Sequence, residues 1–386
     1  MIIQRQIGSE FKKLLDEYPV VTIIGPRQAG KTTLARYLLP DYTYISLENP
    51  ENKNFATEDP IAFLKQYSNR VIFDEIQNTP HLLSYLQGIV DNKQQNGQFV
   101  LTGSNQLQLS SIISQSLAGR TAILKLLPLS ISELSTAKIK FDSFEEYLFN
   151  GFLPAIYDKK QRANRAYANY YQTYVLRDIR LLINLKDISL FEKFLKLLAG
   201  RVGQIINYQS LGNDVGVSSK TIKHWLSVLE VSFIIFKLPP YFENFGKRAI
   251  KSPKYYFSDC GLLSYLLGIN QSLQISRDPL VGNMFENLVI LEILKFFYNQ
   301  GLMGDLYFYR NSNNQEIDLL FKQDNNLVGV EIKSSSTWHN SFGKNLLNYS
   351  KNIKELDKKI IIYNGKKQDS INGIKAINFK EVADNL

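Results

Sequence analysis

The sequence predicts an α/β protein in which a parallel-sheet domain precedes a helical connector, a helix-turn-helix with two strands, and a second α/β domain. Three patterns support this prediction. Residues 20–39 run from a β-branched apolar stretch through a glycine-bounded loop into a helix. Residues 207–230 are typical of two short helices around a glycine, and residues 316–333 of two strands around a polar turn. We place the four parts at 1–135, 136–200, 201–260 and 261–386.

The composition is that of a folded chain without membrane spans. At 386 residues the chain is long enough for two or three domains, and 44% hydrophobic with 21% charged residues argues against wholesale disorder. The single cysteine, Cys260, excludes an internal disulfide and favours a reducing compartment. The N-terminal stretch lacks the apolar core of a secretory signal, and no apolar run is long enough to cross a bilayer. We therefore expect a cytoplasmic protein with no membrane partner.

The net charge is +9, from 45 basic and 36 acidic residues. This excess favours an acidic partner such as nucleic acid. A lysine-rich proteome would give the same value, so charge alone does not decide between the two readings.

The glycine-bounded loop belongs to the stretch "VVTIIGPRQAGKTT". Gly25-x4-Gly30-Lys31-Thr32 matches the P-loop pattern, with a strand before it and a helix after it. Backbone N–H groups of the loop would cradle the β-phosphate of a nucleotide, Lys31 would reach the β- and γ-phosphates, and the Thr32 hydroxyl would ligate Mg²⁺. The predicted nucleotide-binding residues are Gly25, Pro26, Arg27, Gln28, Ala29, Gly30, Lys31, Thr32, Thr33 and Asp74.

Two later strands end in polar residues that would complete this site. "RVIFDEIQ" ends in Asp74, which would hold the Mg²⁺ through water, and Glu75, which would polarise the attacking water. "GQFVLTGSNQ" ends in Thr102, Ser104 and Asn105, which are candidates for sensing the γ-phosphate. Asn105 could also orient the attacking water. An ordinary exit from a strand into a loop is the alternative.

Arg120, in "SLAGRTAIL", follows a probable helix. An arginine often completes a phosphoryl-transfer site, from the same chain or from a neighbouring chain in a homo-oligomer. A surface arginine is the alternative.

The segments "GPRQAGKTTLA", "IFDEIQ", "LTGSN" and "SLAGR", in that order, resemble the prokaryotic AAA-superfamily ATPases that carry an uncharacterised C-terminal domain. The resemblance implies an ATP site at Gly25 to Thr33, with Asp74 and Glu75 as its acidic pair. It also implies ATP rather than GTP. One departure is Glu48 in "ISLENP", where relatives of this kind carry Asp.

Residues 207–230, "NYQSLGNDVGVSSKTIKHWLSVLE", have the pattern of a helix-turn-helix. The first helix would end at Gly216, and Ser218 or Ser219 would cap the second. Two strands would follow as a wing. A basic recognition helix and wing suit DNA, although winged helices also connect proteins. The predicted DNA contacts are Lys220, Lys223, His224, Lys247, Arg248 and Lys251.

Residues 316–333, "EIDLLFKQDNNLVGVEIK", are predicted to form a β-hairpin. A turn centred on Asp324 and Asn325 places Asp318 opposite Glu331, and a shift by one residue places it opposite Lys333 instead. Either register leaves all three groups on one face. Opposed carboxylates repel each other, so a divalent cation would offset the cost.

The order of Glu286 on a helix, Asp318 on a strand and Glu331-x-Lys333 on the next resembles the PD-(D/E)xK superfamily of restriction endonucleases and Holliday-junction resolvases. The resemblance implies Mg²⁺ bound by Asp318, Glu331 and the carbonyl of Ile332, with Glu286 as an additional ligand. Lys333 would position the hydrolytic water. Degenerate copies of this fold survive as scaffolds.

Two functions follow from these patterns. The first is an ATP-hydrolysing, DNA-associated protein with a metal-dependent nuclease domain. The second is an ATP-controlled switch whose nuclease-like domain is not catalytic and binds DNA or a protein. The predicted catalytic residues are Glu75, Lys31, Arg120, Asn105 and Lys333.

Overall fold

The computed structural model describes residues 2–93, 95–104, 116–177, 179, 187–241, 252–311, 313–352, 354–366, 368–371 and 373–386. Their contacts divide the chain into two compact units. The N-terminal unit comprises residues 1–129 with 231–233 and 297–302, and the C-terminal unit comprises the rest. Most residues of the last three predicted parts lie in the C-terminal unit, and the boundaries between these parts stay predictions.

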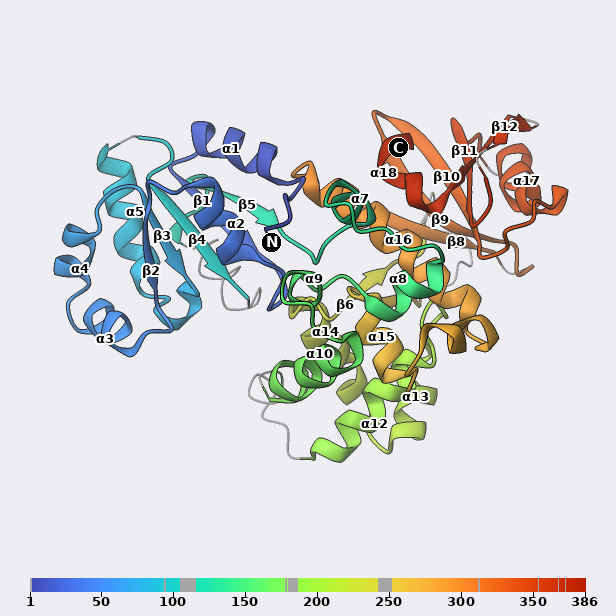
Figure 1. Cartoon of the computed structure of the whole chain (residues 1–386), viewed down its shortest axis with the longest axis horizontal. Helices are drawn as coiled ribbons and strands as arrows, with labels where there is room; N and C mark the ends of the chain where they lie inside the picture. The colour runs from blue at the N-terminus through green and yellow to red at the C-terminus, as the bar shows by residue number, and fades with distance from the viewer. Residues whose placement is uncertain are drawn as a thin grey trace. The chain divides into compact units, whose positions relative to one another are not determined.

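The N-terminal unit is built on a parallel five-stranded sheet in the order β2-β3-β4-β1-β5. Its strands are β1 (Val20–Ile24), β2 (Thr43–Ser46), β3 (Val71–Asp74), β4 (Phe99–Gly103) and β5 (Thr121–Lys125). Its helices include α1 (Gly8–Glu17), α2 (Lys31–Leu38), α3 (Pro50–Glu58), α4 (Pro60–Gln66), η1 (Ile76–Asn78) and α5 (Leu82–Lys93) (Figure 1). The order and the parallel pairing confirm the predicted P-loop NTPase fold.

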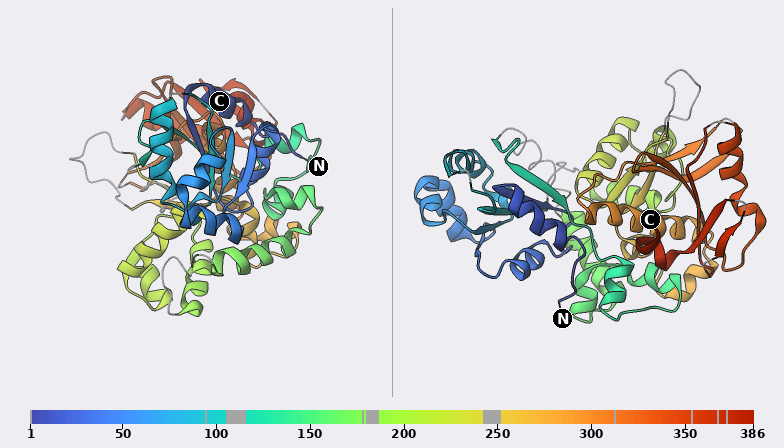
Figure 2. Two further views of the ribbon diagram at one scale, coloured as in Figure 1. Left: turned by 90° about the vertical axis from the view of Figure 1, so that its left-hand side faces the viewer. Right: turned by 90° about the horizontal axis from the view of Figure 1, so that it is seen from above.

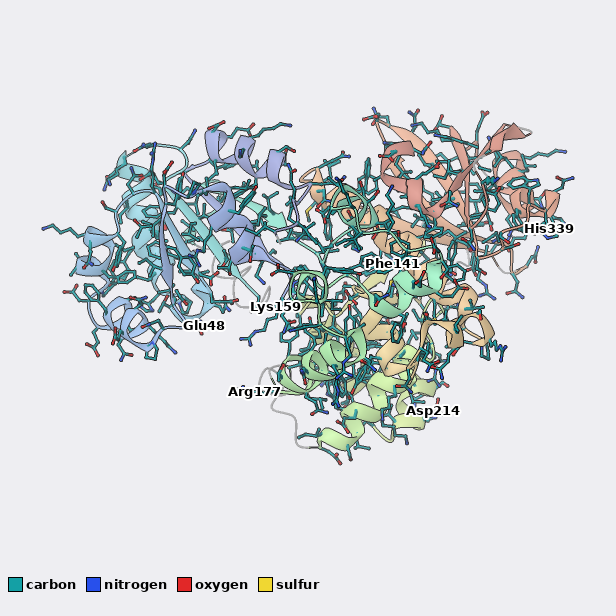
Figure 3. The ribbon with its side chains drawn as sticks, in the orientation of Figure 1. Glu48, Phe141, Lys159, Arg177, Asp214 and His339 are labelled. Atoms are coloured by element: carbon teal, nitrogen blue, oxygen red, sulfur yellow. The ribbon has the colours of Figure 1, made fainter. Side chains whose placement is uncertain are left out.

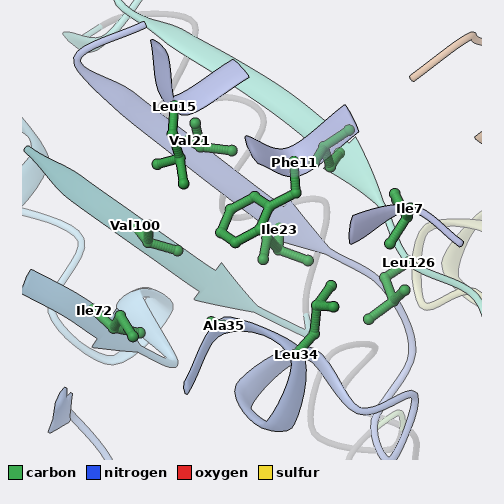
Figure 4. Close-up of a cluster of buried hydrophobic side chains, with 11 residues drawn as sticks. Ile7, Phe11, Leu15, Val21, Ile23, Leu34, Ala35, Ile72, Val100 and Leu126 are labelled. Atoms are coloured by element: carbon green, nitrogen blue, oxygen red, sulfur yellow. The ribbon is translucent and has the colours of Figure 1, made fainter. Parts of the chain in front are cut away.

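The core of this unit explains why its central strands are continuous apolar runs. Every residue of β1, β3 and β4 is buried, as expected for strands that are covered on both faces. Helix α1 contributes Phe11 and Leu15, which pack beside Val21 and Ile23 of β1 (Figure 4). The sheet is thereby a rigid support for the loops at its carboxyl edge.

The C-terminal unit begins with helices and a helix-turn-helix. Its elements up to the second sheet are α7 (Ile131–Thr136), α8 (Phe144–Asn150), α9 (Pro154–Asp158), α10 (Ala163–Tyr170), the π-helix η2 (Tyr171–Leu176), α12 (Ile188–Ala199), α13 (Tyr208–Val215), α14 (Ser219–Val231), β6 (Ile235–Leu238), β7 (Lys254–Phe257), α15 (Cys260–Leu266), η3 (Ser272–Arg277) and α16 (Val281–Asn299). Strands β6 and β7 pair antiparallel.

A mixed six-stranded sheet completes the C-terminal unit, in the order β12-β13-β11-β10-β9-β8. Its elements are β8 (Leu306–Arg310), β9 (Glu316–Gln323), β10 (Asn326–Lys333), η4 (Asn340–Gly343), α17 (Lys344–Asn352), β11 (Lys358–Tyr363), β12 (Gln368–Ile371), β13 (Ile374–Asn378), η5 (Phe379–Glu381) and α18 (Val382–Asn385). Strand β10 pairs antiparallel with β9 and parallel with β11. Helix α17 packs on the sheet through Leu346 and Tyr349, and Figure 2 shows these elements from two further sides.

The β9–β10 hairpin has the first of the two predicted registers. Asn326 pairs with Gln323 and Val330 with Leu319, so the next position places Asp318 opposite Glu331. Asp324 and Asn325 both have positive φ, as a two-residue type I′ turn requires. The turn residues therefore fix which carboxylates face each other.

Within the part of the chain that the structure describes, no helix has the length and apolarity that a bilayer crossing requires.

Candidate active site

The loop between β1 and α2 is shaped by residues that tolerate unusual backbone geometry. A Cβ on Gly25 would collide with the backbone carbonyl oxygen of Leu126, so only glycine fits there. Gln28 and Gly30 have φ of 63° and 92°, which turns the loop toward the first residues of α2. The N–H groups at a helix N-terminus attract anions, so this loop has the form of a phosphate site.

Lys31 opens α2 and is buried. Its ammonium donates to the carbonyl oxygens of Gly25 at 3.0 Å and Pro26 at 2.9 Å. Burial lowers the pKa of Lys31 to about 8, although the carboxylates of Glu75 and Asp74 oppose this shift. The amine is therefore held inside the loop.

Asp74, at the end of β3, is the centre of a hydroxyl network. Its Oδ1 accepts from the hydroxyl of Thr32 at 2.7 Å and from that of Thr102. Its Oδ2 accepts from the hydroxyl of Tyr44 at 2.9 Å. The structure thus brings the two predicted magnesium ligands, Thr32 and Asp74, into direct contact.

Tyr44 is a site residue that the sequence pattern did not reveal. Burial, together with Asp74, raises the pKa of its phenol to about 12, so the hydroxyl remains a donor. The guanidinium of Arg36 lies 4.6 Å from the centre of its ring. Strand β2 pairs with β3, and this pairing brings the Tyr44 hydroxyl within reach of Asp74.

Glu75 is held in a left-handed conformation with φ of 57°. Its Oε2 accepts from the Ser104 hydroxyl at 3.0 Å and from the amide of Gln77, and its N–H donates to Thr102 at 3.2 Å. A positive φ in a residue with a side chain costs on the order of 1 kcal/mol, and such strain gathers at functional sites. Thr102 and Ser104 therefore contact the acidic pair, whereas Asn105 lies outside the described residues.

Glu48, an exposed residue labelled in Figure 3, lies near the phosphate-binding loop. Its carboxylate lies 3.6 Å from the guanidinium of Arg27 in the loop. The pair is solvent-exposed, so its contribution to stability is small.

Arg120 lies away from the nucleotide loop of its own chain. It precedes β5, whose Thr121 pairs with Val20 at the amino end of β1, whereas the loop follows the carboxyl end of β1. Its guanidinium pairs with Asp91 of α5 at 2.5 Å. Of the alternatives that the sequence left open, this position favours a surface arginine or a role in a neighbouring chain over a role in its own site. A role at the site of a neighbouring chain stays a prediction.

The helix-turn-helix is formed by α13 and α14. Gly216 ends α13 in the left-handed conformation, and the hydroxyl of Ser218 accepts from the N–H of Thr221 at the start of α14. Trp225 of α14 packs against Phe191 and Phe194 of α12. The hydrophobic face of α14 is thereby fixed.

The opposite face of α14 exposes Lys220, Lys223 and His224, as expected. The ammonium of Lys223 lies 5.2 Å from the centre of the Tyr208 ring. The remaining predicted DNA contacts, Lys247, Arg248 and Lys251, lie outside the described residues.

In the second sheet, Lys333 lies between the two opposed carboxylates. Its ammonium donates to Glu331 at 2.6 Å and to Asp318 at 3.3 Å, and Asp318 also accepts from the N–H of Ile332 at 2.8 Å. Burial, and then the Asp318 carboxylate, raise the pKa of Glu331 to about 8, and Lys333 opposes the rise. Oε1 of Glu331 is buried and has no hydrogen bond among the described residues. The nearby Asn345 side chain acts to lower the pKa of Glu331.

Glu286 is engaged elsewhere. Its carboxylate accepts from the Lys254 ammonium at 3.1 Å and from the hydroxyl of Tyr256. Lys254 is buried and also pairs with Glu316 at 2.5 Å. Burial acts to lower the pKa of Lys254, but the carboxylates of Glu286 and Glu316 raise it above its usual value, so its charge is retained.

These ion pairs bear on the predicted metal site. Among the residues that the structure describes, no three His, Cys, Asp or Glu side chains are placed to share a metal ion. Burial, and then the Asp318 carboxylate, raise the pKa of Glu286, although Lys254 opposes the rise, so Glu286 and Asp318 lie near each other and the ligand set of Glu286, Asp318 and Glu331 stays a prediction. Asp318 and Glu331 alone face each other, and their carboxylate oxygens are the donors that Mg²⁺ prefers.

Three family models match separate parts of the chain. A family model described as AAA domain matches residues 17–135. Two domains of unknown function, DUF8612 and DUF4143, match residues 141–273 and 281–382.

Several proteins resemble the chain over most of its length. The uncharacterised proteins Mb2031c of Mycobacterium bovis and Rv2008c of Mycobacterium tuberculosis are each 30% identical to it over 341 residues, 87% of this chain and 75% of each relative. An uncharacterised protein of Haemophilus influenzae is 28% identical over 299 residues, which are 73% of this chain and 70% of the relative. Among solved structures, the Walker-type ATPase PABY2304 of Pyrococcus abyssi aligns with 69% of this chain and 96% of its own, at 15% identity and a TM-score of 0.44, which is too distant to assign a function. This chain belongs to the same family as the two mycobacterial proteins, and its residues 17–135 are an AAA-type P-loop ATPase domain.

Proposed function

We propose that this AAA-type ATPase acts on DNA, with ATP and Mg²⁺ at the loop of residues 25–33 and a nuclease site at Asp318 and Glu331. The observation that carries the proposal is the placement of Lys333 between these two buried or half-buried carboxylates, on one face of the β9–β10 hairpin. Two acids and a lysine on one face are the groups that phosphodiester hydrolysis needs.

At the nucleotide site each residue has a distinct role. Lys31 would exchange the carbonyl oxygens of Gly25 and Pro26 for phosphate oxygens, which are better partners for an ammonium ion. Thr32 and Asp74 would hold Mg²⁺, which neutralises charge on the phosphates when it is bound. Glu75 would polarise the attacking water after its carboxylate releases the hydrogen bond from the Ser104 hydroxyl.

We assign DNA binding to the exposed face of α14. Lys220, Lys223 and His224 share this face, while Trp225 and its neighbours anchor the opposite face. The two strands β6 and β7 follow the helix as the strands of a wing would. An exposed basic helix of this kind contacts phosphates first and bases second.

At the second site, Asp318 and Glu331 would hold Mg²⁺, whose charge would neutralise the scissile phosphate. Lys333 would turn from the carboxylates to position the hydrolytic water. This change is possible on a hairpin where Lys333 is about one-third exposed and its side chain is long.

A second function is favoured by a different observation. Lys254 pairs with Glu286 and Glu316, so Glu286 already has a cationic partner and would not serve as a third metal ligand beside Asp318 and Glu331. In that case the second sheet would be a non-catalytic scaffold, and the ATPase would act as a switch that binds DNA or a protein.

Incubation of the full chain with supercoiled plasmid separates the two functions. The reactions contain Mg²⁺, Mn²⁺ or EDTA, each with and without ATP. Metal-dependent cleavage that Asp318→Asn abolishes and the exposed control Asp305→Asn retains would support the nuclease. If the wild type leaves the plasmid intact in every reaction yet hydrolyses ATP, the nuclease assignment is rejected and the switch is favoured.

A further inference from the structure

The segment before α1 reaches the phosphate-binding loop through Arg5. Its guanidinium donates to the carbonyl oxygen of Ala29, inside the loop, at 2.7 Å, and to that of Leu127, after β5, at 2.6 Å. One planar group therefore joins three segments of the N-terminal unit. Bonds from a charged donor are stronger than neutral ones, and the fixed fork of arginine sets their directions.

Arg5 is itself held in place. Its backbone carbonyl accepts from the N–H of Gly8 at 3.1 Å, in the turn that starts α1. Ile7 is fully buried in the core beside Leu126 (Figure 4). The guanidinium thus projects from a rigid support, which makes it suited to fix the position of another group.

The bond to Ala29 has a consequence for the ligand. Ala29 and Gly30 share one trans peptide plane, in which the carbonyl and the N–H point in opposite directions. With the Ala29 carbonyl bound to Arg5, the N–H of Gly30 is directed away from Arg5. Gly30, at φ of 92°, is one of the loop residues whose N–H would receive the β-phosphate.

We propose that Arg5 is a positioning residue of the nucleotide site, which sets the direction of the Gly30 N–H for the β-phosphate without touching the nucleotide. This inference rests on the proposed ATP site at residues 25–33. Because the β-phosphate is common to both nucleotides, loss of Arg5 weakens ATP and ADP equally. Turnover at saturating ATP changes little, because Asp74 and Glu75 are not moved.

Titration of the full chain with mant-ATP and mant-ADP tests this inference in Arg5→Ala and Arg5→Lys. We expect about a tenfold rise in both dissociation constants for Arg5→Ala, the scale of losing one charge-assisted hydrogen bond. Arg5→Lys gives a smaller rise, because an ammonium ion lacks the fork that spans two carbonyls. Lys13→Ala, an exposed cation on α1, is the matched control and retains wild-type affinity.

A merely structural role gives a different result. It would lower the melting temperature of the nucleotide-free protein while leaving both dissociation constants unchanged, and this outcome would overturn the inference. The variant Lys31→Ala distinguishes a failure of the Arg5 inference from a failure of the proposed nucleotide site. Weakened binding in Lys31→Ala with normal binding in both Arg5 variants would refute only the role of Arg5, whereas normal binding in all three would refute the site as well.

Discussion

The hydroxyl of Thr32 donates a 2.7 Å hydrogen bond to Oδ1 of Asp74, which joins the start of α2 to the end of β3. Residues 42 positions apart are thereby placed as two ligands of one cation would be. Asp74 also accepts from Tyr44 on the neighbouring strand. The network holds the carboxylate in one orientation, so the Mg²⁺ binding that we propose would need little reorganisation of Asp74.

Asp74→Asn should reduce ATP turnover by about a hundredfold or more, the scale of losing one preorganised electrostatic group. The amide retains an oxygen that accepts from Thr32 but lacks the charge that attracts Mg²⁺. Steady-state phosphate release measures the effect. Tyr44→Phe, which removes a single donor to Asp74, should cause a much smaller loss. Equal turnover in Asp74→Asn and the wild type would contradict the assignment of Asp74.

Arg120→Ala should leave ATP turnover per chain unchanged in dilute solution. Its guanidinium pairs with Asp91 at the edge of the sheet opposite the nucleotide loop, so it cannot reach its own site. Turnover measured across a range of protein concentrations checks this expectation. Activity that rises with wild-type concentration and is lost in Arg120→Ala would assign the arginine to the site of a neighbouring chain in a homo-oligomer.

Lys220→Glu combined with Lys223→Glu should weaken binding to duplex DNA and flatten its salt dependence. Each neutralised phosphate contributes about one unit to the slope of log K against log salt, so loss of two contacts should lower the slope by about two. Fluorescence anisotropy with labelled duplex at several salt concentrations gives this slope.

Lys140→Glu with Lys159→Glu is the matched control, because it makes the same charge change at exposed lysines outside the helix-turn-helix. If both double variants lose affinity alike, binding depends on net charge alone. Unchanged affinity in the α14 variant would instead assign α13 and α14 to a protein contact.

The features that were predictable from the sequence are those fixed by local geometry. Gly25 and Gly30 mark the loop because the backbone there tolerates little else. The hairpin was predictable from its polar turn, but its register was left open between two alternatives, which the positive φ of Asp324 and Asn325 decides. A signal for the position of Arg120 also existed. Arg120 immediately precedes an apolar strand of the parallel sheet. A residue in that position lies at the edge where the strands begin, whereas the nucleotide loop lies at the edge where they end.

Contacts between distant segments left no periodic trace in the sequence. Arg5 lies in an irregular segment and reaches Leu127, 122 positions away. Lys254, which lies close in sequence to the predicted wing lysines, is buried against Glu286 and Glu316 from two other elements. Such ion pairs depend on how elements pack, which neither hydrophobic spacing nor motif matching specifies.

Buried acids should make the free energy of unfolding fall as the pH rises above about 8.5, because they remain protonated in the folded chain. Burial, and then the Asp259 carboxylate, raise the pKa of the Cys260 thiol and of the Tyr167 phenol above their ordinary values. In the unfolded chain these groups ionise at ordinary values, so each lowers stability by up to about 1.4 kcal/mol per pH unit above its unfolded pKa. Lys31 acts in the opposite direction, because its folded pKa of about 8 lies below its unfolded value. Urea midpoints at pH 8 and pH 10 measure the net change.

Cys260→Ala isolates the share of this effect that comes from the thiol, and its stability should decline less between the two pH values than that of the wild type. The fully buried thiol should also resist a thiol-reactive dye at pH 8 until denaturant unfolds the chain. Rapid labelling of the native protein would contradict both expectations, because it would place Cys260 in contact with solvent. An identical pH slope in Cys260→Ala and the wild type would leave Tyr167 and the other buried phenols as the source of the decline, since their pKa values are raised in the same direction.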